Sequence, residues 1–336
     1  MADRAALSTA FLQAAGWGAA SRTFLAGDAS DRSYDRLHLG AQTAVLMDAP
    51  PGLGDDPAEF LKIAGHLSGL GLSAPACLHS DLGHGFLLLE DLGDGLYAKL
   101  IMHDPALELP LYGAAVDVLA HLQFHLPCPD LPNLTAPDWA TAAGFAVDWY
   151  AFAITGARAS TPDFRAVMAD LMQRYADGPR VMVLRDYHAE NLLWLPERHG
   201  LARVGLLDFQ LGQLGQPGYD LVSLLQDARR DVSEHVKAAM IARFMAATGG
   251  ESAAFETAFA VLGAQRALRI LGVFARLCLV GAKPGYLPLI PRVWGHLQCN
   301  LAHPALAPLA KICARLLPEP TPQALALIGS KCGHFR

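Results

Sequence analysis

The chain has 336 residues, of which 52% are hydrophobic and 17% charged, and its formal net charge is −6. This balance excludes an intrinsically disordered chain, and the absence of a basic block argues against a nucleic-acid-binding protein. The length suffices for two lobes with separate hydrophobic cores, since single cores stop growing at about 250 to 300 residues.

The N-terminal part of the chain predicts a small sheet with two helices. A short helix is expected over residues 7–16, followed by strands over 23–25, 34–39 and 43–47 that turn residues separate. Residues 56–70 predict a helix with Pro57 in its first turn, and two more strands are expected over 76–79 and 86–90. This order of elements predicts an α+β region.

The remainder of the chain has a mostly helical pattern. Val116, Leu119 and Leu122 recur at three-residue intervals, as one buried helical face requires. Three short apolar strands, over residues 180–184, 192–195 and 204–207, interrupt the helices. Helices are predicted over residues 110–126, 139–154, 164–175, 220–230 and 234–248, and over 251–317 with breaks at 283–285 and near 304.

Cysteine spacing and hydropathy favour a cytoplasmic location. The six cysteines show none of the short paired spacings of zinc or redox sites, so we expect mostly buried free thiols. No charged leader with an apolar core opens the sequence, so export is not expected. The most apolar stretch, residues 258–282, contains Arg266, Arg269 and Arg276, which argues against a membrane span.

Three polar side chains follow the short strands at a spacing that is typical of a catalytic site. Asp186 follows the first strand, Asn191 comes five positions later, and Asp208 follows the third strand. This is the spacing that phosphoryl transfer from ATP requires in the kinase fold. Asp186 can accept the proton of an attacking hydroxyl, while Asn191 and Asp208 offer the oxygen ligands that Mg²⁺ prefers. The alternatives are an aspartate that caps a turn and two turn residues that flank a hairpin.

A second candidate motif lies between the first two strands. Gly27 permits a turn, and Asp28 and Ser30 follow it in a loop whose amides and hydroxyl can bind phosphate oxygens. The loop is not a GxGxxG sequence, so the residues alone equally describe a hairpin with a polar tip.

These motifs together resemble the aminoglycoside phosphotransferase-like kinases, which are relatives of the protein kinases. The resemblance covers residues 26–230, and within this family the chain looks most like the bacterial anomeric kinases of N-acetylmuramate and N-acetylglucosamine. Three segments suggest that branch: Gly27-Asp28-Ala29-Ser30-Asp31-Arg32-Ser33-Tyr34, Val45-Leu46-Met47-Asp48-Ala49-Pro50-Pro51, and Arg185-Asp186-Tyr187 with Leu207-Asp208-Phe209-Gln210.

The resemblance implies a bilobal protein-kinase-like fold. A small antiparallel-sheet N-lobe over residues 1–92 would bind the nucleotide, and a larger, mostly helical C-lobe over 93–336 would hold the catalytic and substrate-binding residues. The implied cofactors are ATP and Mg²⁺, and the implied reaction is phosphorylation of the anomeric hydroxyl of an amino sugar in cell-wall sugar recycling. A small sugar is then the expected partner, with neither a nucleic acid nor a membrane.

Roles for individual residues follow from the same resemblance. Asp186 is implied as the catalytic base and Asn191 and Asp208 as the metal ligands. Asp220 reads by itself as a helix N-cap, and the resemblance adds that it braces the catalytic loop. The implied nucleotide-binding residues are Gly27, Asp28, Ser30, Arg32, Met47, Glu90 and Leu92.

The third strand departs from most kinases of this fold. Met47 stands where they place a lysine that pairs with the α and β phosphates, a replacement that the sugar-kinase branch shares. Arg32 or Arg36 are the candidates to supply the missing charge, although both also read as solvated surface arginines. Gln210 replaces the glycine that follows Asp-Phe, which argues against a large movement of that loop.

Substrate contacts are expected in the helical part. Asp148 and Trp149 offer a hydrogen-bonding and aromatic platform for a sugar, although such residues also serve the core. Arg185 and His188 lie in the catalytic loop, where the histidine reads as a structural or substrate-facing donor and not as a second base. The three arginines of residues 258–282 can meet an anionic substrate or pair with surface acids.

Two other functions remain open at this point. An aminoglycoside, choline or other amino-alcohol kinase would need acidic residues near its active site, whereas the late helices are rich in arginine. A nucleotide-binding pseudokinase that acts as a protein partner is favoured by the missing lysine. Retention of Asp186, Asn191 and Asp208 argues against it, because a binding module has no need of a base.

Overall fold

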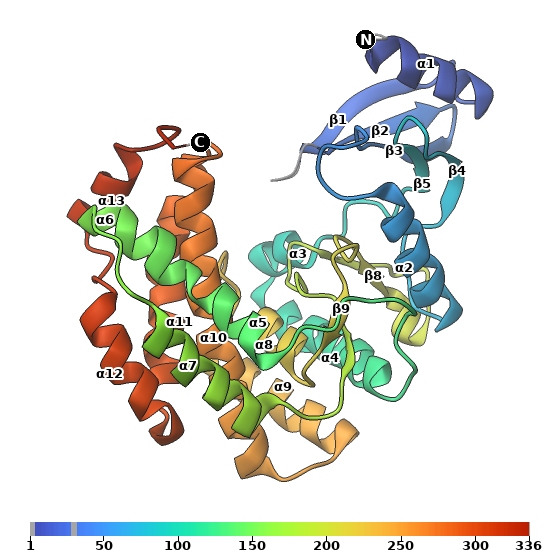
Figure 1. The fold of residues 1–336 in the computed structure, drawn as a ribbon. Coiled ribbons are helices and arrows are strands. Elements are labelled where there is room, and N and C mark those ends of the chain that lie inside the picture. The colour runs from blue at the N-terminus through green and yellow to red at the C-terminus, as the bar shows by residue number, and fades with distance from the viewer. Residues whose placement is uncertain (1–3, 28–31, 336) are drawn as a thin grey trace. The chain divides into compact units, whose positions relative to one another are not determined.

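The computed structural model describes residues 4–27 and 32–335 and divides into two compact units (Figure 1). Unit 1 comprises Met1–His121, Cys128–Asp130 and Ala189–Gly212, and unit 2 comprises Leu122–Pro127, Leu131–His188 and Gln213–Arg336. Unit 1 therefore continues beyond residue 92, where the resemblance placed a lobe boundary. Each unit is described by itself below.

Unit 1 is built on the predicted antiparallel sheet. Its strands are β1 (Ser21–Gly27), β2 (Ser33–Leu39), β3 (Gln42–Asp48), β4 (Cys77–Asp81) and β5 (Phe86–Glu90), in the order β1-β2-β3-β5-β4. On β3, Ala44 and Leu46 join a buried cluster with Phe11 and Leu12 of α1 (Arg4–Ala14). Because side chains alternate along a strand, Met47 belongs to the opposite face of the sheet, and it is buried as well. The α+β prediction for this region is confirmed.

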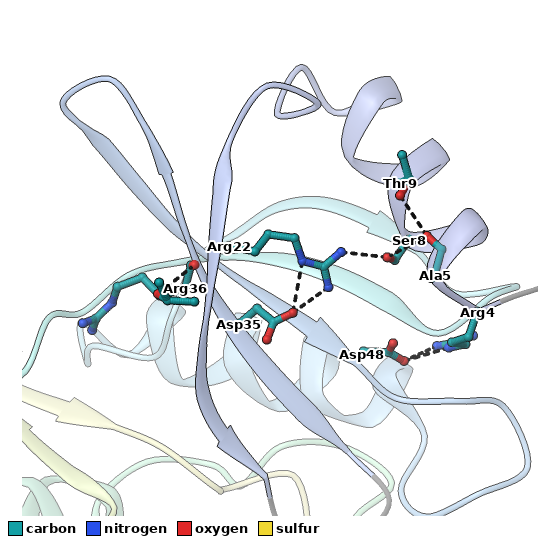
Figure 2. A network of polar contacts seen from close by, with 9 residues as sticks. Arg4, Ala5, Ser8, Thr9, Arg22, Asp35, Arg36 and Asp48 are labelled. Carbon is teal, nitrogen blue, oxygen red and sulfur yellow. Dashed lines mark hydrogen bonds and ion pairs between the residues drawn. The ribbon is translucent and has the colours of Figure 1, made fainter.

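Ion pairs fasten α1 to the sheet (Figure 2). The Arg4 Nε donates a 2.8 Å hydrogen bond to the Asp48 carboxylate, and its guanidinium lies 4.0 Å from the centre of the Phe86 ring. Arg22 of β1 donates to Ser8 of α1 and to Asp35 of β2. The helix thus reads as a cover for the apolar face of the sheet.

Helix α2 (Pro57–Gly69) begins where its sequence predicts. The Asp56 side chain accepts a 2.8 Å hydrogen bond from the amide of Ala58, which satisfies one of the free amides at the helix start. On the buried face, the Phe60 ring stacks on Phe209 with centroids 4.9 Å apart. This contact holds the segment after β8 (Val204–Leu206) against α2.

The predicted hairpin completes unit 1. Strand β7 (Leu192–Trp194) pairs antiparallel with β8, with Leu192 opposite Leu206. The short helix α3 (Tyr97–His103), which the sequence pattern did not predict, is tied to this hairpin by a 2.7 Å hydrogen bond from the Trp194 amide to the Gly95 carbonyl. A side chain at Gly95 would collide with the Trp194 backbone, so the close approach requires glycine.

Unit 2 is a helical assembly around α10 (Ser252–Leu279), which packs against α5 (Ala136–Ala143) and α11 (Ile290–Leu301). Helix α10 is long and apolar enough to cross a membrane by composition, yet most of it is buried within unit 2, so it reads as a core helix. The other helices and strands of the two units are α4 (Glu108–Gln123), α6 (Phe152–Thr155), α7 (Pro162–Leu171), α8 (Tyr219–Leu225), α9 (Glu234–Thr248), α12 (Ala307–Leu316), α13 (Pro322–Gly329), β6 (Val181–Val183) and β9 (Gln213–Gly215).

Several predicted helices differ from the structure at their ends. The helix expected over residues 139–154 is α5, a π-helical turn (Ala146–Ala151) and α6, and it begins earlier because Thr135 and Asp138 form a capping box. The helix expected over 220–230 ends at Leu225. Beyond it, the Asp227 carboxylate accepts from the amide of Arg229 at 2.8 Å, a turn that competes with helix continuation.

All six cysteines are free thiols. Cys128, Cys278 and Cys313 are buried, whereas Cys77 and Cys299 are exposed, so the expectation of buried thiols holds for half of them. Among residues 4–27 and 32–335, no group of three or more histidine, cysteine, aspartate or glutamate side chains could hold a metal ion.

Candidate active site

Asp208 and Asn191 come together within unit 1 at the ends of the β7–β8 hairpin. The Leu207 amide donates a 3.0 Å hydrogen bond to the Asn191 carbonyl, and the Asn191 side-chain nitrogen lies 3.4 Å from Asp208 Oδ2. Asp208 has a φ of 56°, which few residues other than glycine adopt, and its carboxylate is one-third exposed. The backbone thus turns an accessible carboxylate toward the amide of Asn191.

A buried arginine contacts the same carboxylate. Arg32, which is only 4% exposed, has its Nη2 3.2 Å from Asp208 Oδ1 and 3.6 Å from Asp55 Oδ2. Gln210 Nε2 donates to Asp208 Oδ1 at 2.7 Å and lies 3.4 Å from Asp55 Oδ2. We call Arg32, Asp55, Asp208 and Gln210 the Asp208 cluster. The sequence interpretation included Arg32 and missed Asp55.

The donor set of the Asp208 cluster suits a hard divalent cation. It offers carboxylate oxygens from Asp208 and the amide oxygen of Gln210, and such oxygens are what Mg²⁺ binds. Gln210 is 5% exposed, and its buried Oε1 has no hydrogen-bond partner among the residues that the structure describes. A buried acceptor without a donor favours a bound cation or water at that position.

The second arginine candidate is engaged elsewhere. Arg36 forms an ion pair with Asp91 at 2.9 Å and another with Asp94 at 2.8 Å, both in the segment that follows β5. These bonds raise the pKa of Arg36, although burial acts in the opposite direction. Arg36 therefore fastens β2 to this segment and is not poised as a phosphate ligand.

The other predicted nucleotide-binding residues spread over the sheet and the segment after it. Gly27 ends β1 opposite Ser33 of β2. Met47 is 1% exposed. Glu90 forms an ion pair with Arg198, and Leu92 is partly buried. Asp28 and Ser30 lie outside the described residues.

Asp186 belongs to unit 2, in a loop whose backbone α8 holds in place. The Asp220 carboxylate accepts from the amides of Leu184 and Arg185 at 2.6 and 2.9 Å, and Ser223 Oγ donates to the Arg185 carbonyl at 3.0 Å. Arg185 has a φ of 72°. Such a strained backbone persists only where its surroundings fix it, and the side chains from α8 do so here.

Asp220 acts differently from the N-cap that its place in the sequence predicted. Gly218 is the N-cap of α8, and Asp220 in the first turn uses both carboxylate oxygens on the loop before Asp186. Burial raises the pKa of Asp220 to about 7, against the two backbone hydrogen bonds, which lower it. No sequence pattern indicated the hydrogen bond of Ser223 to the loop.

The charges of three arginines act on Asp186. Burial acts to raise the pKa of Asp186, but nearby charges, of which that of Arg269 is the largest, outweigh it and hold the pKa below the ordinary aspartate value. Arg266 is buried and donates to Ser223 Oγ at 2.7 Å, which extends the brace of the loop into α10. The Asp186 carboxyl is therefore ionised at neutral pH.

His188 lies deep in unit 2 beside this loop. Burial lowers the pKa of His188 to about 4, so the ring is neutral at pH 7. Its Nε2 lies 3.3 Å from Nη1 of Arg229, and because a guanidinium only donates, this nitrogen is the acceptor. This contact favours a structural role.

The predicted sugar platform lies on the π-helical turn. Asp148 forms an ion pair with Arg165 at 2.9 Å, and the guanidinium of Arg276 lies 5.6 Å from the Trp149 ring. Both side chains thus have protein partners.

Comparison with known proteins identifies the family. Residues 21–256 match the phosphotransferase enzyme family. The chain belongs to this family. It is similar to an N-acetylmuramate/N-acetylglucosamine kinase of Caulobacter vibrioides, with 41% identity over 95% of this chain and 98% of the relative. A kinase of the same name from Pseudomonas aeruginosa is 34% identical over 90% of this chain and 91% of its own length.

A solved structure supports the fold. The chain is similar to a choline/ethanolamine kinase family protein from Mesorhizobium loti, with a TM-score of 0.61, 12% identity, and coverage of 98% of this chain and 100% of that one. The resemblance and the kinase-like fold that the sequence predicted are confirmed, and the chain is a phosphotransferase that acts on a hydroxyl group.

Proposed function

We propose that this phosphotransferase is an ATP- and Mg²⁺-dependent kinase that converts N-acetylmuramate or N-acetylglucosamine to the sugar 1-phosphate. The names of two relatives that match over nearly their whole length support the acceptor. The enzyme then acts in the cytoplasm, in the recycling of cell-wall sugars.

The choice of hydroxyl is supported by the Asp186 loop, whose backbone Asp220 and Ser223 hold in place and in which nearby charges lower the pKa of Asp186. A weak base accepts a proton most readily from an acidic hydroxyl, and an anomeric hydroxyl is more acidic than an ordinary alcohol. The arginines that lower this pKa also disfavour a cationic acceptor such as choline or an aminoglycoside, because like charges repel at short range.

In this mechanism Asp186 accepts the proton of the anomeric hydroxyl, whose oxygen forms the new bond to phosphorus as the bond to ADP breaks. Asp220 and Ser223 keep the Asp186 loop in one conformation, which aligns the base before the substrate arrives. Asp208 and Asn191 would hold Mg²⁺, which neutralises charge on the phosphates when bound.

The test is a substrate screen with product analysis. Purified protein is incubated with ATP, Mg²⁺ and N-acetylmuramate, N-acetylglucosamine, their 1-O-methyl glycosides, choline or an aminoglycoside, and the products are examined by phosphorus NMR. We expect a phosphorus signal coupled to the anomeric proton and no reaction of the methyl glycosides. A 6-phosphate, or methyl glycosides that react equally well, would reject the anomeric assignment. Failure of every acceptor would favour the pseudokinase.

A further inference from the structure

Neither partner of the usual kinase ion pair is in its place in unit 1. Protein kinases pair a lysine of the third strand with a glutamate of the following helix, and the lysine contacts the phosphates. Here β3 carries the buried Met47, and the acid in the first turn of α2, Glu59, pairs with Lys62 at 2.5 Å. If the enzyme binds ATP, another cationic side chain with an acidic partner is needed to contact the phosphates.

The Asp208 cluster contains a pair with the same charges and a related position. Arg32 directly precedes β2, and Asp55 stands next to Asp56, the N-cap of α2. The pair therefore links the start of β2 to the start of α2, the helix that follows β3 in the chain. A buried guanidinium is stable only with acidic partners, and Asp208 and Asp55 lie 3.2 and 3.6 Å from Arg32.

The charges of the cluster explain why it holds two carboxylates. Asp55 and Asp208 together carry one negative charge more than Arg32 neutralises. A divalent cation held by the Asp208 carboxylate would compete with Arg32 for that carboxylate, and like charges would then push the guanidinium away. Asp55 offers Arg32 a second partner, so the arginine stays near the metal when it leaves Asp208.

We propose that Arg32 and Asp55 replace the lysine and glutamate pair: Arg32 binds phosphate oxygens of ATP, and Asp55 positions Arg32 once a divalent cation occupies Asp208. The inference rests on the proposed function only in that the nucleotide is ATP. An arginine suits this role because its planar fork of donors can contact a carboxylate and a phosphate together.

The proposed role predicts that replacing Arg32 weakens the binding of Mg-ATP but tightens the binding of a divalent cation alone. A purely structural role predicts no such opposite effects. In Arg32→Gln, calorimetry without sugar should show Mg-ATP binding weakened by about 10- to 100-fold, since charge-assisted hydrogen bonds to phosphate are lost. In the same variant, Mn²⁺ alone should bind the nucleotide-free protein a few-fold more tightly, because Asp208 loses the Arg32 guanidinium that competes with the metal ion. Electron paramagnetic resonance measures this binding.

Neighbouring aspartates supply the control for Asp55. Asp55→Asn should raise KM for ATP about three- to tenfold with little change in KM for the sugar. Asp56→Asn removes the same charge at the next residue, but asparagine is an equally good N-cap, so ATP binding should stay within about twofold. Arg32→Lys keeps the charge and should bind ATP better than Arg32→Gln.

The outcomes separate this inference from the proposed function. A parent protein that binds ATP but phosphorylates no sugar would contradict the proposed acceptor and leave the pair standing. Equal ATP binding by the parent, Arg32→Gln and Asp55→Asn would overturn the pair. Thermal melting identifies a variant that fails to fold. If Arg32→Gln does not fold, the other variants decide. Equal ATP binding by the parent, Arg32→Lys and Asp55→Asn then rejects the proposed role of Arg32 and Asp55. Weaker ATP binding by Asp55→Asn than by Asp56→Asn supports it.

Discussion

The Asp208 cluster of unit 1 and the Asp186 loop of unit 2 both combine aspartates with arginines, but aspartates are in excess in the cluster and arginines are in excess around Asp186. In the cluster, Asp208 and Asp55 share one arginine, so negative charge is in excess and Asp208 remains one-third exposed. Around Asp186, three arginines act on the carboxylate and lower its pKa. The excess of acid suits a cation site, and the excess of arginine suits an ionised base that meets an anionic or neutral acceptor.

Removing the acid of the cation site should have the largest effect. Asp208→Ala takes away the anionic ligand to a phosphate-bound cation, so we expect turnover to fall by at least about 10³-fold and Mg-ATP binding to weaken. Asn191→Ala should act in the same direction but less completely. Asp170→Ala, which removes an exposed acid paired with Arg174, is the control and should change neither quantity.

Calorimetry with Mg-ATP checks this prediction. If Asp208→Ala bound Mg-ATP as tightly as the parent does, the cation would bind elsewhere, and the Asp208 cluster would not be a cation site.

Removing the base should have the next largest effect. Asp186→Asn keeps the shape of the side chain but cannot accept the proton, so kcat should fall by about 10² to 10⁴-fold while ATP affinity is nearly unchanged. Steady-state kinetics with calorimetry measure both. Turnover within a few-fold of the parent would show that Asp186 is not the base.

The sequence predicted those elements of the fold that depend on local patterns. Helix α9 has the predicted bounds because Ser233 caps it and Gly249 ends it, and both signals lie in adjacent residues. Strand β9 was missed because its three residues have no pattern of their own and pair with β6, far away in the chain. The kinase-like fold came from motif spacing and resemblance together.

The polar clusters depend on distant residues and were predicted only in part. Arg32 was one of two arginine candidates to replace the lysine charge, and only the resemblance favoured it; the structure adds that Arg36 is paired with Asp91 and Asp94. Asp55 gave no signal, since an aspartate before a helix reads as a cap. Asp220 was expected both to cap its own helix and to brace the catalytic loop; Gly218 is the N-cap instead, and the amides 36 and 35 positions earlier donate to the Asp220 carboxylate.

The brace behind the Asp186 loop should have a moderate effect. Ser223→Ala removes the hydroxyl that links Arg266 to the Arg185 carbonyl and leaves a buried guanidinium with one acceptor fewer. We expect a loss of about 1 to 3 kcal/mol in the free energy of unfolding and a fall in kcat of about tenfold or less, with KM for ATP unchanged.

Urea denaturation and kinetics test this brace. Ser252→Ala, which removes an exposed hydroxyl bonded to Glu256, is the matched control. If Ser223→Ala matched this control in both stability and kcat, Ser223 would not support the loop.

The smallest effect should come from the charge that tunes the base. Arg269 is the strongest of the charges that lower the pKa of Asp186, so Arg269→Gln should raise that pKa. Asp186 accepts a proton only when ionised, and a higher pKa means that it is protonated at higher pH. The acidic limb of kcat/KM should therefore move to higher pH, with the ratio of activity at pH 5 to activity at pH 8 reduced. Arg276→Gln, a change on the same helix at a residue that contacts Trp149, should leave the limb in place. An acidic limb equally unmoved by Arg269→Gln would mean that the arginines around Asp186 do not set its ionisation, and the contrast with the acid-rich Asp208 cluster would then be structural and not catalytic.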